Sequence, residues 1–232
     1  MPRIKGRKPE ATREAVLDAA VWAFAELGYE NATLATIAQK AGVTAATLPY
    51  HFSDKQGLWD AVIELFYKEM LAFAATLKGD VEDPIGEALP RFYDWALAHR
   101  NGIRVIIRNV IETGALDRQV REVRMGVAFD LVTKLAVKRY GVSETAARDA
   151  TIAVTHLITR FVTNSPADNR LAFAVKSDAE ARERIVALLV RTARALIGPP
   201  PAFTLAAPAT RVTELASPSG THPPRRQGGE GG

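Results

Sequence analysis

The stretch of this chain with the clearest binding chemistry covers residues 33–55 and reads TLATIAQKAGVTAATLPYHFSDK. Thr33 can cap a short helix, and Gly42 supplies the left-handed residue that ends it. Thr44 then takes the capping position of a second short helix, which we predict over residues 45–50. Two short helices joined by a tight glycine turn are typical of a helix-turn-helix, whose second helix lies in the major groove of DNA. The chemistry predicted here is therefore hydrogen bonding to bases and phosphates.

The side chains of this stretch divide by the part of a DNA duplex that they would reach. Small exposed residues on the second helix would face base edges, where sequence is read, and larger polar residues at its end would reach phosphates. The first group is Ala45, Ala46 and Thr47, and the second is Tyr50, His51 and Lys55. The full set of predicted DNA-binding residues is Arg7, Lys8, Thr33, Thr44, Ala45, Ala46, Thr47, Pro49, Tyr50, His51 and Lys55.

This stretch, together with TREAVLDAAVWAFAELGYENAT before it, resembles the amino-terminal domain of the TetR (tetracycline repressor) family of bacterial regulators. The resemblance covers residues 10–66. The positions that carry it are Phe24, Gly28, Tyr29, Thr33, Ile37, Ala38, Gly42, Val43, Leu48, His51, Phe52 and Lys55. The resemblance implies an all-α fold, in which an amino-terminal three-helix helix-turn-helix DNA-binding domain precedes a carboxy-terminal helical ligand-binding and dimerisation domain.

Two positions depart from the family pattern. Pro49 stands where the family usually has tyrosine, and Ala45 where it often has a basic residue. A proline several residues into a helix removes a hydrogen bond at a cost of roughly 3 kcal/mol, and it biases the preceding Leu48 away from helical angles. We therefore expect a recognition helix that is short or ends in a looser turn. Because phosphate contacts are also lost, we expect DNA binding to depend more on the amino-terminal arm.

Composition limits the class of protein. The chain has 232 residues, of which 47% are hydrophobic and 24% charged, as in ordinary soluble globular proteins. It has no cysteine, which excludes disulfides and thiolate metal sites and fits a reducing cytoplasm. No apolar run approaches the roughly 18 residues of a membrane span, and residues 1–10 lack the apolar core of a signal peptide. We expect a cytoplasmic protein without membrane association, cofactor or metal.

The formal net charge is +4. The distribution of the charged residues along the chain is more informative about binding partners than the net charge. Arg3, Lys5, Arg7 and Lys8 all precede the first acidic residue, Glu10. Such a cationic arm can follow a phosphate backbone or enter a minor groove, although a solvated terminus would have the same composition. Its place just before a helix-turn-helix favours the DNA contact.

The periodicity of apolar residues predicts helices throughout and no strand. The predicted ranges are 12–27, 34–41, 45–50, 54–77, 84–99, 103–113, 116–140, 144–163 and 178–197. Capping boxes are predicted at Ser53 with Gln56 and at Ser177 with Glu180. Residues 101–102 are predicted to break the chain, Pro90 to kink its helix, and residues 167–176 to form a partly helical connection. We divide the chain into a basic flexible arm (1–9), a DNA-binding domain (10–56), a ligand-binding and dimerisation domain (57–198) and a disordered tail (199–232).

The last two helices are apolar on more than one face, so they should be buried on two sides. Both sides could face the core of one chain, but a symmetric four-helix interface explains the pattern better, and the family resemblance implies the same. The predicted dimer interface comprises Val154, Leu157, Ile158, Phe161, Ile185, Leu189, Ala193 and Leu196. Two recognition helices would then lie roughly 35 Å apart and read a palindromic operator.

The middle helices offer apolar surface with a few polar groups, the usual lining of a small-molecule pocket. The predicted pocket residues are Trp95, His99, Arg108, Phe129, Thr133, His156 and Arg160. An arginine on a helix is more often solvated, and a lone histidine is more often a hydrogen-bonded core residue, so each residue also has a purely structural interpretation. An effector is expected through the family resemblance alone.

These features predict a homodimer that represses transcription from a palindromic operator in double-stranded DNA. A small, largely apolar effector would shift the helix over 54–77 and release the DNA. The chain has no phosphate-binding glycine loop, nucleophile elbow or paired histidines, so an enzyme finds little support. The alternative is a helical ligand-binding adaptor or enzyme in which the helix-turn-helix is only a packing motif.

Overall fold

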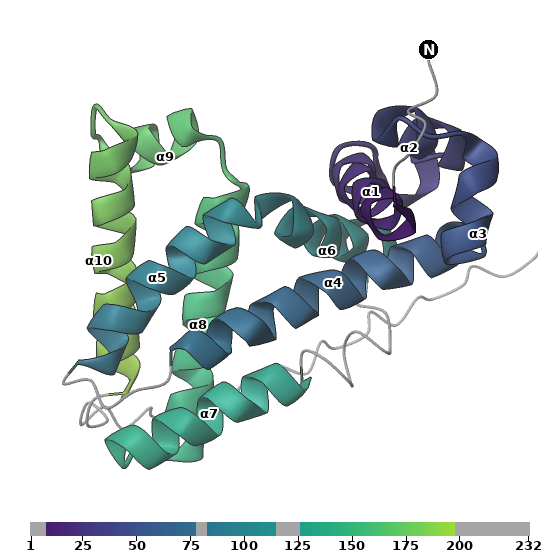
Figure 1. Cartoon of the computed structure of the whole chain (residues 1–232). Helices are drawn as coiled ribbons and strands as arrows, with labels where there is room; N and C mark the ends of the chain where they lie inside the picture. Colours follow the sequence, from purple (N-terminus) through teal and green to yellow (C-terminus); the bar gives the residue numbers. More distant parts are fainter. Residues whose placement is uncertain (1–7, 78–82, 115–125, 198–232) are drawn as a thin grey trace, which may run out of the picture. The chain divides into compact units, whose positions relative to one another are not determined.

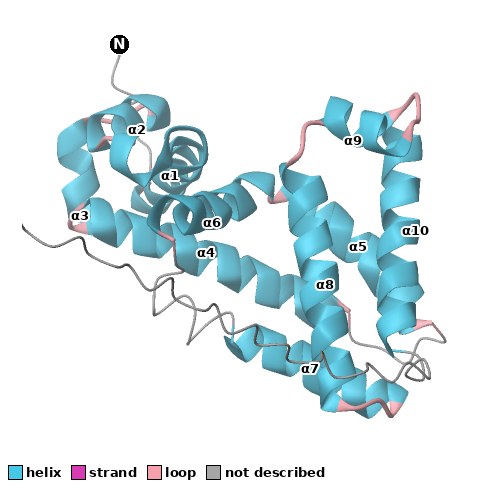
Figure 2. Ribbon diagram, turned by 180° about the vertical axis from the view of Figure 1, so that it is seen from behind, coloured by secondary structure: helices cyan, strands magenta, loops and turns pink. Residues whose placement is uncertain are grey.

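The regular elements of the chain are all helical within residues 8–77, 83–114 and 126–197, which are the residues that this computed structural model describes (Figures 1 and 2). The first elements are α1 (Pro9–Asn31), α2 (Leu34–Ala41), a 3₁₀ turn (Ala45–Thr47), α3 (Leu48–Phe52) and α4 (Lys55–Thr76). They are followed by α5 (Pro84–Ala98), α6 (Arg100–Thr113), α7 (Gly126–Tyr140), α8 (Glu144–Thr163), α9 (Pro166–Phe173) and α10 (Asp178–Ile197). The predicted all-α fold is confirmed. Residues 116–125 of the predicted helix over 116–140 and the predicted tail over 199–232 lie outside the described residues.

Three aromatic rings join the amino-terminal helices. The Trp59 ring of α4 lies 5.1 Å from Phe24 and 5.2 Å from Tyr29, measured between ring centroids. Ile37 of α2 and Leu48 of α3 are fully buried in the same core. Tyr29 therefore packs against this core, which α1, α2, α3 and the first half of α4 share.

The predicted signals around α2 are confirmed. The Thr33 hydroxyl accepts a hydrogen bond from the Thr36 N–H at 3.1 Å, as an N-cap should. Gly42 ends α2 in the left-handed conformation, with φ 71°. In α1, Gly28 has φ 81° and ψ 168°, so the regular helix is interrupted at the predicted stop. A short helical segment continues α1 to Asn31.

The second helix of the motif begins differently from the prediction. Residues 45–47 form the 3₁₀ turn, and the α-helical part starts only at Leu48. Pro49 therefore stands in the first turn of α3, where a proline removes no helical hydrogen bond. Leu48 keeps helical angles, with φ −65° and ψ −48°, so the expected shift away from them is wrong. The recognition helix is short, as expected, but its looser turn lies at its start.

The predicted capping box at Ser53 and Gln56 is wrong. Asp54 is the N-cap of α4, since its carboxylate accepts the Gly57 N–H at 2.7 Å. The Ser53 hydroxyl instead donates to the Phe52 carbonyl oxygen at 2.6 Å. At the second predicted box, the Ser177 hydroxyl accepts the Glu180 N–H at 3.2 Å, so the predicted start of α10 is confirmed.

The predicted break at residues 101–102 is also wrong, because both residues lie in the first turn of α6. The chain turns at His99 instead, between α5 and α6. Gly102 serves packing, since a Cβ atom there would lie 2.4 Å from Cδ2 of Phe66 on α4. Asp83 caps α5, which begins at Pro84 as predicted and continues through Pro90.

α8 and α10 pack against each other, and α5 contacts both. Two ion pairs fasten α10 to α5. Arg182 pairs with Asp94, with nitrogen–oxygen distances of 2.6 Å, and Arg194 pairs with Asp83. The predicted connection over 167–176 is partly helical, as expected, because it contains most of α9.

The described helices all belong to one unit that covers residues 1–200. The predicted boundary between residues 56 and 57 stays a prediction. Across residues 8–77, 83–114 and 126–197, no helix is both long and apolar enough to cross a membrane.

Replacing Pro49 by alanine should change the free energy of unfolding by less than about 1 kcal/mol, because the proline occupies the first turn of α3. Urea unfolding followed by circular dichroism measures this. As a control, Leu48→Ala empties a fully buried site and should cost about 2 to 5 kcal/mol. A gain near 3 kcal/mol for Pro49→Ala would instead mean that the proline interrupts the helix.

Candidate DNA interface

The residues predicted to face base edges lie at the surface of the 3₁₀ turn and α3. Thr44, Ala45, Ala46 and Pro49 are exposed, and Thr47 is half-buried. The hydroxyl oxygens of Thr44 and Thr47 lie 3.0 Å apart and share a hydrogen bond. These side chains are short, so a DNA groove could approach the backbone of the turn closely.

Two aromatic residues extend this surface. Tyr50 has 83% of its surface exposed, and its ring meets the His51 ring edge-on at 5.1 Å between centroids. His51 is half-buried and lies 6.1 Å from the buried Phe52 ring. The core therefore supports the imidazole from one side, while the phenol hydroxyl of Tyr50 reaches outward. Both side chains can donate hydrogen bonds to phosphate oxygens.

Lys55, predicted to contact phosphate, has partners within the chain. Its Nζ atom donates to the Glu30 carbonyl oxygen at 3.0 Å and lies 4.5 Å from the centroid of the Tyr29 ring. The Tyr29 hydroxyl donates in turn to Oε1 of Gln56 at 2.9 Å. Burial raises the pKa of Tyr29, and the charge of Glu30 adds to the effect, so the phenol stays a donor at neutral pH. These contacts tie the start of α4 to the end of α1.

Basic residues on α1 and α2 border the same unit. The Arg13 guanidinium lies 5.2 Å from the Phe52 ring centroid, which places α1 beside the end of α3. The Nζ atom of Lys40 lies 4.4 Å from the Trp22 ring centroid. Sequence reasoning missed Arg13 because α1 had only a packing role, and nothing local signals its proximity to α3. Lys8 is exposed at the start of α1, and the predicted Arg7 lies outside the described residues.

The predicted pocket residues have different surroundings. Arg108 of α6 donates to carbonyl groups at the end of α1. His156 and Arg160 are exposed on α8, and the Nδ1 atom of His156 lies 2.8 Å from the Ile152 carbonyl oxygen. Phe129 is half-buried on α7. Arg108 is thus not simply solvated and His156 is not a core residue, and their place in a ligand pocket stays a prediction.

Thr133 of α7 is different, because it is fully buried. Its hydroxyl has no hydrogen-bond partner among the residues that the structure describes. A buried hydroxyl without a partner costs roughly 1 to 3 kcal/mol, so such groups commonly await water or a ligand.

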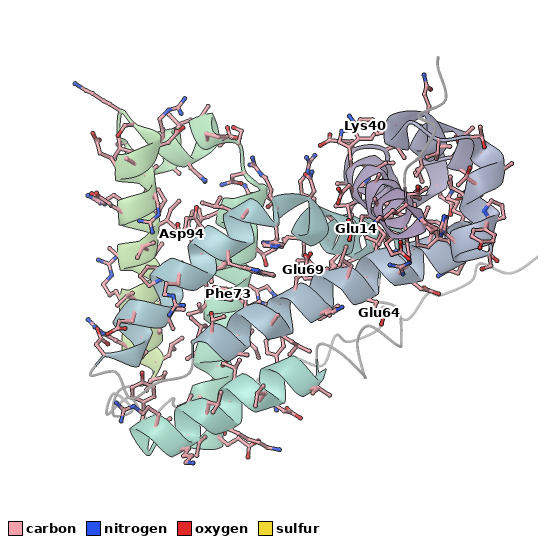
Figure 3. All side chains as sticks on the ribbon, in the orientation of Figure 1. Glu14, Lys40, Glu64, Glu69, Phe73 and Asp94 are labelled. Atoms are coloured by element: carbon pink, nitrogen blue, oxygen red, sulfur yellow. The ribbon has the colours of Figure 1, made fainter. Side chains whose placement is uncertain are left out.

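Trp95 of α5 and His99, which follows the end of α5, belong to an aromatic cluster that faces α4. The Trp95 ring lies 5.6 Å from Phe73 and 4.2 Å from the His99 ring, measured between centroids and stacked in both cases. The Nε2 atom of His99 lies 3.5 Å from a carboxylate oxygen of Glu69. Figure 3 shows Glu69 and Phe73 on α4, on the side that faces α5. Side chains, rather than close backbones, connect the second half of α4 to α5.

Most residues predicted for a dimer interface lie in the chain's own core. Val154, Ile158, Ile185, Leu189 and Ala193 are each at most 7% exposed in the single chain, so they leave little surface for a second copy, and their part in a dimer interface stays a prediction. They are buried because α8 and α10 pack against each other. Leu157 and Phe161 are half-buried, and Leu196 is 37% exposed.

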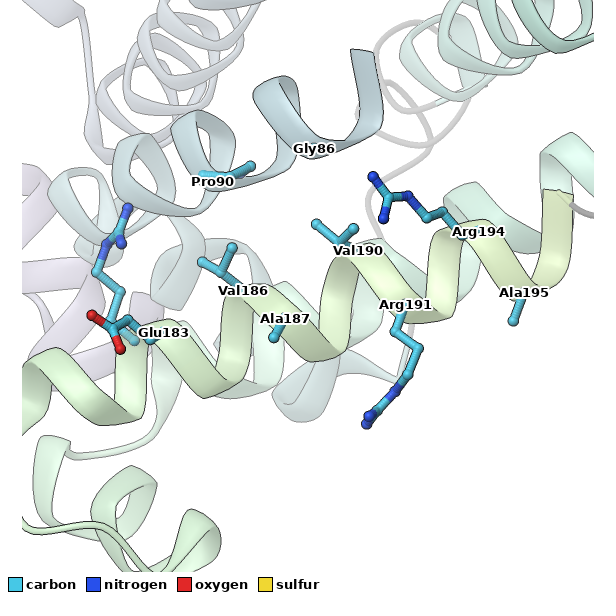
Figure 4. A pocket seen from close by; sticks show the side chains of 10 residues that line it. Gly86, Pro90, Glu183, Val186, Ala187, Val190, Arg191, Arg194 and Ala195 are labelled. Atoms are coloured by element: carbon cyan, nitrogen blue, oxygen red, sulfur yellow. The ribbon is translucent and has the colours of Figure 1, made fainter. Parts of the chain in front are cut away.

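An open groove runs between α5 and α10 (Figure 4). Its apolar lining includes Pro90 of α5 and Val186 and Val190 of α10. Arg182 and Arg194, which form the ion pairs between the two helices, also line it. None of the predicted pocket residues lines this groove.

The helix-turn-helix region matches a known protein family. Residues 16–62 match the family described as bacterial regulatory proteins, tetR family. A transcriptional repressor of Mycobacterium tuberculosis, Rv1474c, is 34% identical over 111 residues, which are 47% of this chain and 58% of that protein. Residues 16–62 are thus a DNA-binding region of the TetR family. The HTH-type transcriptional regulator BetI of Stenotrophomonas maltophilia is 33% identical over 94 residues, which are 40% of this chain and 47% of BetI.

The chain spans about half the length of these curated relatives, and both are named as regulators of transcription rather than as enzymes. Solved structures extend the likeness in fold. A TetR-like regulator from Rhodococcus sp. RHA1 has a TM-score of 0.58 at 23% identity, covering 83% of this chain and all of that one. A fatty acid degradation regulator, FadR, from Bacillus halodurans has a TM-score of 0.56 at 21% identity, covering 84% and 97%. The TetR-family fold thus includes the helices that follow the DNA-binding region.

Replacing Lys55 by glutamine should lower the free energy of unfolding by about 1 kcal/mol in the absence of DNA, because its bond to the Glu30 carbonyl is lost. Urea unfolding measures the effect, and Lys68→Gln on the exposed side of the same helix is the control. An unchanged stability, with only a lower salt dependence of DNA binding, would show that Lys55 contacts phosphate and not Glu30.

Proposed function

We propose that this TetR-family chain is a dimeric DNA-binding regulator of transcription, a repressor that leaves a palindromic operator when a small, largely apolar effector binds. The exposed surface of the 3₁₀ turn and α3, carried on a filled helical core, is the observation that supports the proposal most. Small polar side chains on a rigid helical support suit contact with the major groove.

The neighbouring charges support DNA binding. Lys8 and Arg13 of α1 are exposed, and Arg13 lies beside the end of α3. Cations at such positions can neutralise phosphates on either side of a groove. Tyr50 adds a hydroxyl that can reach the backbone.

The outward faces of α8 and α10 support a dimer. Ile152 is 40% exposed and Leu196 is 37% exposed, and Leu157 and Leu188 are half-buried. These side chains are distinct from the five that are buried between the two helices, Val154, Ile158, Ile185, Leu189 and Ala193. Two copies related by a two-fold axis would bury these faces and present two recognition helices, as a palindrome requires.

An effector is supported by the way in which α4 is held. Its first half belongs to the DNA-binding core, and its second half meets α5 through the rings of Phe73 and Trp95. A ligand that prefers another arrangement of these rings would tilt α4, and without that preference it would shift nothing. The unpartnered hydroxyl of Thr133 could donate to such a ligand.

Selection of a random duplex library by the purified protein tests the proposed function. We expect enrichment of a palindrome whose half-sites are centred roughly 10 base pairs apart, one turn of DNA. Thr47→Ala should alter the enriched sequence, whereas Lys68→Gln should leave it unchanged, because Lys68 lies on α4 outside the proposed DNA surface. Absence of any preferred sequence, in protein refolded to remove bound ligand, would favour a helical adaptor in which the helix-turn-helix only packs.

Replacing Thr133 by valine should raise the free energy of unfolding of the ligand-free protein by about 1 kcal/mol, because a buried unpaired hydroxyl is exchanged for a methyl of the same shape. Thr151→Val on α8 is the matched control. The Thr151 hydroxyl donates to the Ala147 carbonyl oxygen at 2.8 Å, so its loss should not stabilise. Destabilisation by Thr133→Val would mean that the hydroxyl is paired in solution.

A further inference from the structure

The end of α1 carries carbonyl groups that accept hydrogen bonds from side chains, and that of Leu27 accepts one from Nδ2 of Asn31 at 3.2 Å. Gly28 interrupts the helix with φ 81° and ψ 168°, so the turn before it lacks the next N–H groups of a regular helix. The carbonyls of Ala25, Glu26 and Leu27 belong to this turn. The negative end of the helix dipole lies here as well, which favours a cation.

Arg108 of α6 supplies that cation. Its Nη1 atom donates to the Glu26 carbonyl oxygen at 2.8 Å and to that of Ala25 at 3.4 Å. Its Nη2 atom donates to the Leu27 carbonyl oxygen at 3.2 Å. Glu112, one turn further along α6, holds the guanidinium by accepting from Nε at 2.6 Å. A planar guanidinium directs several donors at once, so this contact fixes direction as well as distance.

The sequence around this contact is adapted to it. Arg104, one turn before Arg108, pairs with the Glu26 carboxylate. A Cβ atom on residue 28 would lie 2.8 Å from Nε of Arg108 and 2.6 Å from Oε1 of Glu112. Gly28 is therefore favoured by its positive φ, and any larger residue would also displace the ends of the Arg108 and Glu112 side chains.

α6 connects this contact to the rest of the chain. It packs against α8, α5 and α4 (Figure 1). The contact of α1 with α6 is more extensive than the contact of α1 with α4. At α4, Gly102 of α6 lies against Phe66. From the other side, Lys55 of α4 donates to the Glu30 carbonyl just beyond the break. Cations from two different helices thus cap the two segments of α1.

We propose that Arg108 is a positioning residue that couples α6 to the DNA-binding helices through the carbonyls at the end of α1. A displacement of α6 then moves α1, and with it α2 and α3, directly. The part of this inference that concerns DNA rests on the proposed function, whereas the positioning of α1 does not. In this scheme α4 is the second connection to the DNA-binding helices.

Distances between spin labels test the positioning without DNA or ligand. The chain has no cysteine, so Glu14→Cys on α1 and Glu87→Cys on α5, both exposed, give one unambiguous labelled pair. Labelled chains are mixed with excess unlabelled chains, so that a dimer carries one pair. We expect a narrow distance distribution that Arg108→Gln broadens by about twofold or more. Arg104→Gln is the control, since it removes a contact between side chains but no contact to the α1 backbone, and its distribution should match the parent.

Arg108→Lys keeps the charge but loses the fork of donors, and it serves as the second variant if Arg108→Gln fails to fold. It should also broaden the distribution. An unchanged distribution in the folded Arg108 variant, a broad one in the parent, or an equal change in Arg104→Gln would each overturn the proposal.

Binding to the duplex enriched from the random library tests the consequence for DNA. Arg108→Gln should weaken binding about tenfold, within the usual range of coupling energies, and leave the salt dependence unchanged because Arg108 neutralises no phosphate. A lower salt dependence would mean that Arg108 contacts DNA, which contradicts a positioning role. If the parent protein enriches no duplex, the proposed function fails, and the label distances still decide the role of Arg108.

Discussion

The free energy of leaving carbonyl groups unpaired at the end of α1 is the constraint on which the arrangement of this structure depends. The last carbonyl groups of a helix lack intrahelical donors, and side chains donate to several of them where Gly28 interrupts α1. Arg108 and Lys55 satisfy them from α6 and α4. Since α1 shares its core with α2 and α3, these two side chains contribute to fixing the proposed DNA-binding surface relative to the other helices.

The features that could be predicted from the sequence are those that depend on neighbours in the chain. Thr33, Asp83 and Ser143 cap the helices that follow them, because each side chain reaches a backbone N–H only three residues away. The predicted box at Ser53 failed because Asp54, a carboxylate, took the cap. The local sequence predicts a break at residues 101–102, but the glycine at 102 allows close packing against Phe66, which is distant in sequence.

Periodicity indicates that a face is buried, but it does not identify what buries it. The apolar stripes of α8 and α10 were read as an interface between copies, yet Ile158 and Leu189 are buried where these two helices pack together in one chain. Arg108 was assigned to a pocket because an arginine on an apolar helix suggests a ligand. Its actual partners are backbone oxygens roughly 80 residues earlier in the sequence, a relation that no local pattern encodes.

The proposed DNA surface has an unusual balance of groups. Its base-facing positions carry two alanines and a proline, which offer no side-chain hydrogen bonds, so direct reading of bases falls to the hydroxyls of Thr44 and Thr47. These hydroxyls already bond to each other in the free protein. Sequence preference on such a surface must come from contact with thymine methyl groups and from the shape of the groove as much as from hydrogen bonds. In the proposed dimer, the shape of the groove is read by two DNA-binding surfaces, one on each copy, which must keep a fixed separation. Rigid attachment of α1 to α6 and α4 is therefore more important here than in a protein with many base contacts.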